Sequence, residues 1–321
     1  MTAGQINSQL TRENASILKH LRNAMGITNA ESLAEAVGVG VETVITYIQR
    51  LTDLGYPIRT HINGFELAAS PRDFLFPWEF VGREERVHYF PEIDSTMTVA
   101  RKMARMGCPP FTVVVAERQT LGRGRLNRTW HSPDGGLYFT LVLRPSLRPE
   151  DSGQVNFLTS IVLARVLQAH CGIEAGVKWP NDILVEDRKI AGMLSEQETD
   201  GTRVHYVNIG IGLNVNNDPT PVEPTATSLK KLLGKPVLRA PLLNRFIDEL
   251  ERSIEQMSWE ETLDVWRKLA VTLNRQVRIV TTRETVEGMA MDIDSTGALI
   301  LQLADGTQKR IVYGDCFIRP G

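Results

Sequence analysis

The densest chemical signal in the sequence is a run of arginines and glycines between residues 117 and 130. Four arginines fall within eleven residues, and two glycines alternate with two of them: Arg118, Gly122, Arg123, Gly124, Arg125 and Arg128. Glycine lets a loop wrap closely around a ligand, and guanidinium groups bind carboxylate or phosphate oxygens in pairs. The spacing is neither that of a Walker loop nor that of a dinucleotide-binding fingerprint. The segment is predicted to bind a small anion, with a mobile basic surface loop as the alternative.

A second motif places a lysine beside a turn. Val177 ends a short apolar run, and Lys178-Trp-Pro-Asn-Asp182 follows it. Proline and asparagine after a strand favour a turn, which would hold Lys178 in a fixed position. A lysine directed at a phosphate or acyl oxygen stabilises the charge that develops during group transfer. A single lysine before a turn is more often a solvated charge, so this motif is weak on its own.

Two further motifs could surround a ligand. The run Ile209-Gly-Ile-Gly-Leu-Asn214 alternates glycine with apolar residues, and glycine in a strand permits close approach of a ligand or of another backbone. Ser95 and Thr96 stand at a predicted strand-to-helix junction, where hydroxyls and amides can bind a polar ligand head. Tight strand packing and helix capping are the structural alternatives for these two motifs.

The elements that must position these motifs form a mixed segment over residues 71–270. Strands are predicted at 87–90, 111–117, 137–143, 176–179, 183–185 and 206–214, and helices at 96–105, 154–170 and 242–257. Short strands with few intervening helices favour an α+β fold with a mostly antiparallel sheet. Ser70-Pro71 and the stretch 74–78 interrupt the helical pattern and are predicted to form a linker.

Residues 1–70 are predicted to form three short helices followed by a hairpin. Apolar residues recur at helical spacing from Ile17, Leu33 and Val41, and Gly38 separates the second stripe from the third. Residues 56–67 contain two alternating runs joined at Asn63-Gly64, a strong hairpin signal. This order of elements predicts a winged helix-turn-helix domain.

The charge of this segment gives little support to DNA binding. Residues 1–69 contain five Lys and Arg and six Asp and Glu, so they net 5 − 6 = −1. Contacts to phosphates supply most of the affinity for duplex DNA, and a DNA-binding face usually carries clustered basic residues. The third helix presents polar residues that could contact bases or phosphates, namely Thr43, Thr46, Tyr47, Gln49 and Arg50. Specific DNA binding and a structural or protein-binding role both remain open.

Residues 271–321 alternate again in short runs. Strands are predicted at 276–281, 285–293, 298–303 and 308–313, with turns at Thr296-Gly297, Asp305-Gly306 and Gly314-Asp315. Short strands at this spacing predict a small β-barrel. The sequence is therefore divided into three domains, residues 1–70, 71–270 and 271–321.

Composition excludes several classes of protein. The 321 residues carry a net charge of −2 and 42% hydrophobic residues, a balance that argues against disorder and against a wholly basic nucleic-acid-binding surface. Three widely spaced cysteines do not suggest a disulfide framework or a zinc ribbon. No signal peptide and no apolar stretch of membrane-spanning length is evident. We expect a cytoplasmic protein that does not bind membranes.

Taken together and in order, these motifs resemble those of biotin protein ligases. They are Asp94-Ser-Thr96, Gly122-Arg-Gly-Arg-x-x-Arg128, Lys178-Trp-Pro-Asn-Asp182, Lys189-Ile-Ala-Gly192 and Gly210-Ile-Gly-Leu-Asn214. The order of domains is similar to the bifunctional type, which joins a biotin–[acetyl-CoA-carboxylase] ligase to a biotin operon repressor. The resemblance implies a winged helix-turn-helix, a central domain like class II aminoacyl-tRNA synthetases, and a C-terminal SH3-like barrel.

The resemblance also implies a two-step reaction. Biotin and ATP form biotinyl-5′-adenylate and pyrophosphate, with Mg²⁺ on the phosphates, and a lysine of the biotin carboxyl carrier protein then takes the biotin and releases AMP. Lys178 and Arg123 are the implied catalytic residues. The implied biotin site is Ser95, Thr96, Met97, Gln119, Arg123, Gly124, Arg125, Lys178, Gly192, Gly210 and Gly212. The implied ATP and adenylate site is Arg123, Arg125, Arg128, Trp130, Lys178, Asn181 and Asn214. Operator DNA and a second copy of the chain are further implied partners, and no metal ligand is assigned.

Two positions depart from the family pattern. Met97 stands where many members have asparagine, and Leu126-Asn127 replaces a glycine-containing step of the arginine loop. Asn127 is expected to adopt the backbone geometry of the missing glycine, since asparagine tolerates left-handed backbone. The alternatives are a ligase whose winged helix does not bind DNA specifically, a biotin sensor without catalysis, and a lipoate–protein ligase.

Overall fold

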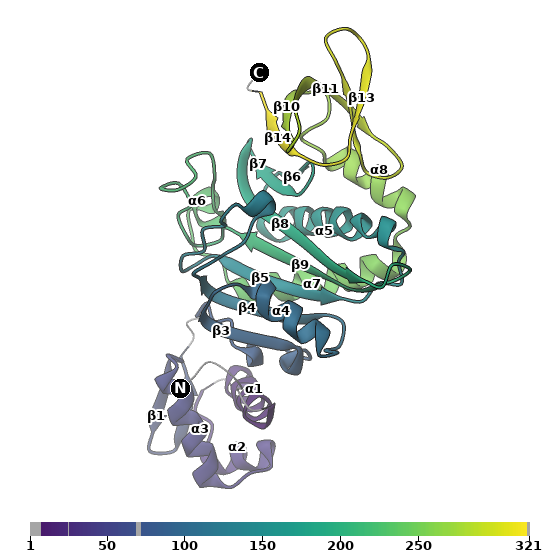
Figure 1. Ribbon diagram of the computed structural model, residues 1–321. Helices are drawn as coiled ribbons and strands as arrows, with labels where there is room; N and C mark the ends of the chain where they lie inside the picture. The colour runs from purple at the N-terminus through teal and green to yellow at the C-terminus, as the bar shows by residue number, and fades with distance from the viewer. Residues whose placement is uncertain (1–7, 25, 69–71, 320–321) are drawn as a thin grey trace. The chain divides into compact units, whose positions relative to one another are not determined.

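The computed structural model describes residues 8–24, 26–68 and 72–319 (Figure 1). The chain forms two compact units. The first comprises Met1–Tyr89 with Leu238–Pro241, and the second comprises Phe90–Val237 with Leu242–Gly321. Each unit is considered by itself.

The first unit contains three helices and a two-stranded sheet, as the sequence predicts. The elements are α1 (Ser8–Asn23), α2 (Ala30–Val37), α3 (Val41–Asp53), β1 (Ile58–His61) and β2 (Gly64–Leu67). The apolar stripe of each helix meets one core that includes Ile17, Leu33 and Ile48. Gly38 ends α2 with φ 75°, the left-handed conformation expected between α2 and α3.

The hairpin turns one residue earlier than predicted. His61 pairs with Gly64, so the turn residues are Ile62 and Asn63, and Gly64 is the first residue of β2. Gly64 has φ 137°, and a Cβ there would collide with the backbone of Thr28. The glycine therefore serves the packing of β2 against residue 28 as well as the turn.

The predicted linker is only partly observed. Ser70 and Pro71 lie outside the described residues. The prediction is wrong for residues 74–78, because Leu75 and Trp78 are buried in the first unit. Trp78 Nε1 donates to the Tyr56 hydroxyl at 2.8 Å, and the ring of Phe74 packs against that of Tyr56 in a tilted arrangement with centroids 4.6 Å apart. Burial of clustered aromatic side chains stabilises the fold, so this stretch packs into the core and does not form a flexible linker.

The second unit is built on a seven-stranded sheet in the order β3-β4-β5-β9-β8-β7-β6. The strands are β3 (Val87–Ile93), β4 (Thr112–Gln119), β5 (Leu137–Leu143), β6 (Ala175–Lys178), β7 (Asp182–Val185), β8 (Arg188–Thr199) and β9 (Val204–Leu213). Pairing from β4 through β6 is antiparallel throughout, which confirms the predicted sheet. The twelve-residue strand β8 was not predicted. The strand β8 pairs with β9 along its whole length, but its second half is polar. Its sequence therefore lacks the alternation of apolar and polar residues that identifies a strand.

The second unit also contains α-helices, some of which cover this sheet (Figure 1). They are α4 (Thr96–Arg105), α5 (Gly153–Cys171), α6 (Leu229–Leu233), α7 (Arg239–Gln256) and α8 (Trp259–Leu269). The bounds of α4 agree with the prediction, whereas α8 was missed. Ser258 and Glu261 form a capping box at the start of α8, a local signal that identifies the helix. The ring of Phe246 in α7 packs edge-on against the ring of Phe139 in β5, with centroids 5.7 Å apart.

The C-terminal part of the second unit is a five-stranded sheet in the order β13-β12-β11-β10-β14. The strands are β10 (Gln276–Val280), β11 (Thr285–Ile293), β12 (Leu299–Gln302), β13 (Gln308–Ile311) and β14 (Asp315–Ile318). The strand β14 was not predicted, and its first residue, Asp315, was assigned to the turn Gly314-Asp315. Trp179 fixes this sheet to the central one: its indole Nε1 donates to the Gly297 carbonyl at 3.1 Å and its backbone N–H to Thr272 at 2.9 Å.

All three cysteines are free thiols. In the described part of the chain no helix has the length and apolar character needed to cross a membrane.

Candidate active site

All of the residues implied for biotin and adenylate lie around one cavity of about 250 Å³ in the second unit. They come from α4, β4, the arginine loop, the β6–β7 turn, β8 and β9. The set is Ser95, Thr96, Met97, Gln119, Arg123, Gly124, Arg125, Arg128, Trp130, Lys178, Asn181, Gly192, Gly210, Gly212 and Asn214. The fold therefore brings motifs separated by more than a hundred residues to one place.

One end of the cavity is built from a chain of hydrogen bonds. The Thr96 backbone N–H donates to Gln119 Oε1 at 2.9 Å, and Gln119 Nε2 donates to Ser132 Oγ at 2.9 Å. Thr140 Oγ1 donates to Thr96 Oγ1 at 2.8 Å. Ser95 Oγ is buried and has no hydrogen-bond partner among the described residues. Because an enclosed hydroxyl without a partner costs free energy, this end suits a polar ligand head.

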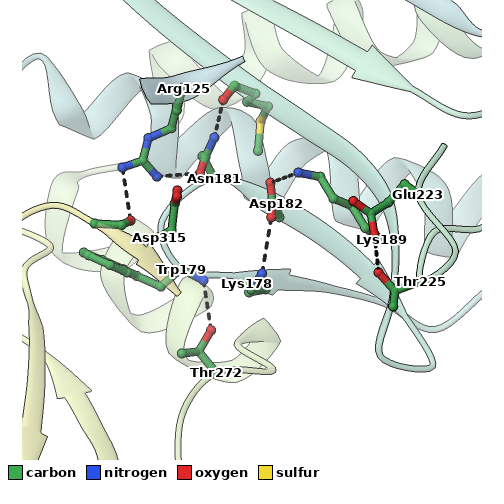
Figure 2. Close-up of polar contacts among 12 residues, drawn as sticks. Arg125, Lys178, Trp179, Asn181, Asp182, Lys189, Glu223, Thr225, Thr272 and Asp315 are labelled. Carbon is green, nitrogen blue, oxygen red and sulfur yellow. Dashed lines mark hydrogen bonds and ion pairs between the residues drawn. The ribbon is translucent and has the colours of Figure 1, made fainter. Parts of the chain in front are cut away.

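Two lysines share one carboxylate at the cavity (Figure 2). Lys178 Nζ lies 3.4 Å from Asp182 Oδ2, and Lys189 Nζ lies 2.7 Å from Asp182 Oδ1. Burial alone would raise the pKa of Asp182, but Lys189 and Lys178 hold that pKa below its usual range. Asp182 is therefore ionised at neutral pH and fixes both ammonium groups. Two positive charges against one negative leave this cluster able to bind phosphate or carboxylate oxygens.

The Trp130 indole lies close to Gly192 of β8 and Gly212 of β9 at the cavity. A Cβ on Gly192 would come within 2.8 Å of the indole, and one on Gly212 would overlap the ring. Lys189 Nζ lies 5.2 Å from the ring centroid, a cation–π contact. The Trp130 Nε1 is enclosed and has no partner in the described part of the chain. The glycines of β8 and β9 are thus required for close approach of an aromatic group.

The arginine loop is fastened to the C-terminal sheet. Arg125 donates to Asn181 Oδ1 at 2.8 Å and to the Gly314 carbonyl at 3.2 Å. Figure 2 shows its guanidinium group between Asn181 and the segment that carries Asp315. Arg128 forms an ion pair with Asp315. Burial lowers the pKa of the Arg125 guanidinium, which still remains charged at neutral pH. The loop is held by residues that lie far away in the sequence.

The same loop departs from expectation at Leu126. Leu126, with φ 51°, takes the left-handed conformation that was assigned to Asn127. This backbone is costly for a branched side chain, and it occurs between the anchored residues Arg125 and Arg128. Arg123 is half exposed, and its guanidinium lies 2.7 Å from Glu196 of β8.

Comparison with known proteins agrees with this geometry. Residues 89–214 match the model of the Biotin/lipoate A/B protein ligase family, and residues 272–319 match the Biotin protein ligase C terminal domain. The Bifunctional ligase/repressor BirA of Bacillus spizizenii is 30% identical over 297 residues, which are 88% of this chain and 91% of that protein.

The chain belongs to the biotin protein ligase family.

Two other relatives support the same assignment. The Biotin–[acetyl-CoA-carboxylase] ligase of Paracoccus denitrificans is 34% identical over 67% of this chain and 93% of its own. The biotin protein ligase of Aquifex aeolicus, solved in complex with biotin and ATP, is 26% identical with a TM-score of 0.62, covering 73% of this chain and 99% of that one. The enzyme is a biotin ligase.

Several cavity residues of this biotin ligase were not predicted. Asp182 and Lys189 belong to motifs that the sequence analysis identified. Their ion pair could have been predicted, because opposite charges flank the turn between β7 and β8. Asp315, which lines the cavity, and Ser132 and Glu196, which contact the cavity residues Gln119 and Arg123, carry no local signal, since each meets its partner only in the folded chain.

Cys316 also lines the cavity of the ligase, where its thiol is buried. Burial raises the pKa of its thiol to about 12. The thiol is therefore protonated at neutral pH, and the thiolate is the reactive form. This favours direct transfer from an activated ligand over a thioester on the enzyme.

Mg²⁺ is not assigned to protein ligands at this cavity. Among the described residues there is no group of three or more His, Cys, Asp or Glu that could hold a metal ion. Asp182, the carboxylate between the two lysines, is already neutralised by them. Magnesium commonly keeps its waters and binds through substrate phosphates, so no protein-ligated ion is assigned.

The residues predicted to face DNA lie on α3 of the first unit. Thr43, Thr46 and Gln49 are exposed, and Arg50 is half buried. Tyr47 differs, because its hydroxyl donates to Glu13 of α1 and this contact with burial raises the pKa of Tyr47 to about 12. Tyr47 thus holds α3 to α1, and it is not a free side chain for reading bases.

Proposed function

We propose that this ligase activates biotin with ATP and transfers it to a lysine of a biotin carboxyl carrier protein. The observation that carries the proposal is the meeting of three groups at one cavity: the polar chain through Thr96 and Gln119, the lysine pair on Asp182, and the arginine loop. The relatives named as biotin ligases, and the Aquifex aeolicus structure with biotin and ATP, support this assignment.

The biotin head is assigned to the polar end of the cavity. Ser95, with its unpartnered hydroxyl, and the Thr96–Gln119 pair would bind the ureido group. Met97, whose sulfur packs against Gly210, would contact the apolar rings. The remaining biotin contacts are assigned to the glycines at positions 124, 192, 210 and 212.

The first step joins the biotin carboxylate to AMP. A carboxylate oxygen attacks the α-phosphorus of ATP, the bond to the β-phosphate oxygen breaks, and pyrophosphate leaves. Lys178 would stabilise the charge that develops on the α-phosphate, held in place by Asp182. Arg123 and Arg125 would neutralise phosphate oxygens. Arg128, Trp130, Asn181 and Asn214 are assigned to the adenosine and phosphates, and Mg²⁺ would enter on the triphosphate.

The second step transfers the acyl group. The uncharged amine of the carrier lysine attacks the biotinyl carbonyl carbon, the bond to the AMP oxygen breaks, and the amine loses a proton. Stacking of the adenylate near Trp130 and closure of the arginine loop would keep water away until the carrier arrives.

The labelling assay tests this function directly. Purified enzyme is incubated with a carboxyl carrier domain, ATP, and either biotin or lipoate, and the carrier is analysed by mass spectrometry. We expect a biotin adduct on the carrier lysine that depends on ATP. Labelling with lipoate alone would refute the proposal, and a biotin–ATP complex that never labels the carrier would favour a sensor without catalysis.

We also propose that the first unit is a winged helix that binds operator DNA and that the C-terminal sheet is an SH3-like barrel. Support comes from the helix–hairpin order of residues 8–67 and from the relatives named as ligase and repressor. The domain boundaries 1–70, 71–270 and 271–321, a cytoplasmic location and a homodimer remain parts of the same proposal. The alternative is an enzyme that only ligates, with a winged helix that does not recognise a DNA sequence.

A further inference from the structure

A buried asparagine turn follows β9 at the cavity. Asn214, at 3% exposure, lines the cavity, and Asn217, at 6%, lies three residues further along. The backbone of the turn is held at both ends: Asn214 N–H donates to Ile190 at 2.9 Å and Asn216 N–H to Gly135 at 2.7 Å. The two amide side chains are therefore presented from a rigid backbone.

The hydrogen bonds of Asn217 determine which way its amide points. The Val215 backbone N–H can only donate, and it lies 3.1 Å from Asn217 Oδ1. The other atom of the amide must then be Nδ2, a donor. It lies 2.9 Å from Asn214, so the Asn214 atom that it meets is the acceptor Oδ1.

This chain of contacts leaves Asn214 with one polarity toward the cavity. Its Oδ1 is occupied by Asn217, and its Nδ2 has no partner among the described residues. The group available to a ligand is thus a hydrogen-bond donor. Adenine offers ring-nitrogen acceptors and an exocyclic amino donor, and only the acceptors can pair with a donor.

We propose that Asn217 is a positioning residue that fixes Asn214 as a donor to the base of ATP. The inference rests on the proposed function, in which Asn214 contacts the nucleotide. Asn217 acts through Asn214 and does not contact the substrate. It makes the nucleotide site select a ring-nitrogen acceptor over an amino group.

The variant Asn217→Asp reverses this polarity with almost no change in shape. Both carboxylate oxygens accept, so one keeps the Val215 N–H and the other can pair only with the Asn214 Nδ2. Asn214 must then rotate and present Oδ1 to the cavity. One hydrogen bond to the base is lost and two acceptors face each other, which raises the KM for ATP by about tenfold while the KM for biotin stays unchanged.

Asn216→Asp is the matched control. It makes the same change in the same turn, but the Asn216 side chain pairs with the backbone of Val237 and not with Asn214. It is expected to lower the melting temperature without separating the two KM values. If Asn217→Asp fails to fold, Asn214→Asp serves instead, since it replaces the donor by a carboxylate and keeps the contact with Asn217.

The decisive measurement compares ATP with 1-deaza-, 3-deaza- and 7-deaza-ATP, each lacking one ring acceptor. In the wild type one analogue is expected to lose about tenfold in kcat/KM, and in Asn217→Asp that penalty disappears. An unchanged KM for ATP in Asn217→Asp, no penalty in the wild type, or an equal penalty in both proteins would overturn the inference. A wild type that shows no ATP-dependent biotin labelling would instead refute the proposed function.

Discussion

Lys178 is the residue on which the chemistry depends most. Its Nζ lies at the cavity beside Asp182, which is also paired with Lys189, so the carboxylate keeps one partner when Lys178 is removed. We expect Lys178→Ala to abolish biotin-dependent exchange of pyrophosphate into ATP while the protein stays folded, because Asp182 keeps its ion pair with Lys189. Lys178→Arg, which keeps the charge, is the control. A large drop in melting temperature would indicate a structural role instead.

Asp182 predicts a dependence of stability on pH. Its pKa is held below the ordinary value of 3.8 by the two lysines, so the folded state binds this proton less readily than the unfolded state. The carboxylate stabilises the fold above the ordinary pKa, and this stabilisation is lost as the pH falls through the lowered pKa. Asp182→Asn should be less stable than the wild type at neutral pH, and the difference should shrink in acid.

Urea unfolding of both proteins across this pH range measures the effect. A difference that stays constant with pH would contradict the assignment. The same variant should form adenylate more slowly, because neither ammonium group is then held in place.

At the scale of elements, the arginine loop and the C-terminal sheet act together. Arg125 bridges the loop to Asn181 and to the Gly314 carbonyl, which lies 189 residues away in the sequence. Arg123 pairs with Glu196 from a half-exposed position, where an ion pair contributes about 1 kcal/mol or less. The two arginines therefore restrain the loop to different degrees.

We expect both Arg125→Ala and Arg123→Ala to release biotinyl-adenylate early. Hydrogen bonds from a charged group contribute about 1.5–3 kcal/mol each, so Arg125→Ala should speed the release of biotinyl-adenylate by about tenfold or more. Arg123→Ala should have a smaller effect, of about fivefold or less. Loss of adenylate from the gel-filtered complex measures both rates. Unchanged retention in Arg123→Ala would remove that residue from the site, and a larger effect there than at Arg125 would contradict the anchoring role.

For the molecule as a whole, charge separates the two proposed activities. Residues 1–69 net −1, and two of their five basic residues, Arg12 and Arg22, are paired with Glu85 and Glu79. About three basic residues then remain for phosphates, which predicts a slope near −3 for the logarithm of DNA affinity against the logarithm of salt concentration per chain.

A salt titration of binding to the upstream region of the biotin genes tests both the number of phosphate contacts and the recognition of a DNA sequence. Preference for that sequence over a scrambled duplex supports operator recognition, with Thr43→Ala as the variant that should reduce it. A shallow slope with no preference would leave the enzyme a ligase only.

Local sequence determined which motifs and which elements this chain contains. Alternation over 137–143, helical spacing over 96–105 and glycine at position 38 specify their structures through neighbouring residues. The arginine loop and the turn around Lys178 could be identified for the same reason, since residue types at short spacing limit the chemistry.

Only the tertiary structure decided how these groups are held. Arg125 meets Gly314, Gln119 meets Ser132, and residues 74–78 pack into a core that their own pattern does not reveal. The donor polarity of Asn214 likewise depends on Asn217 being placed by the Val215 backbone. Local periodicity records which face of an element is apolar, whereas a hydrogen bond between distant residues depends on the position and direction of both partners, which exist only once the sheets have formed.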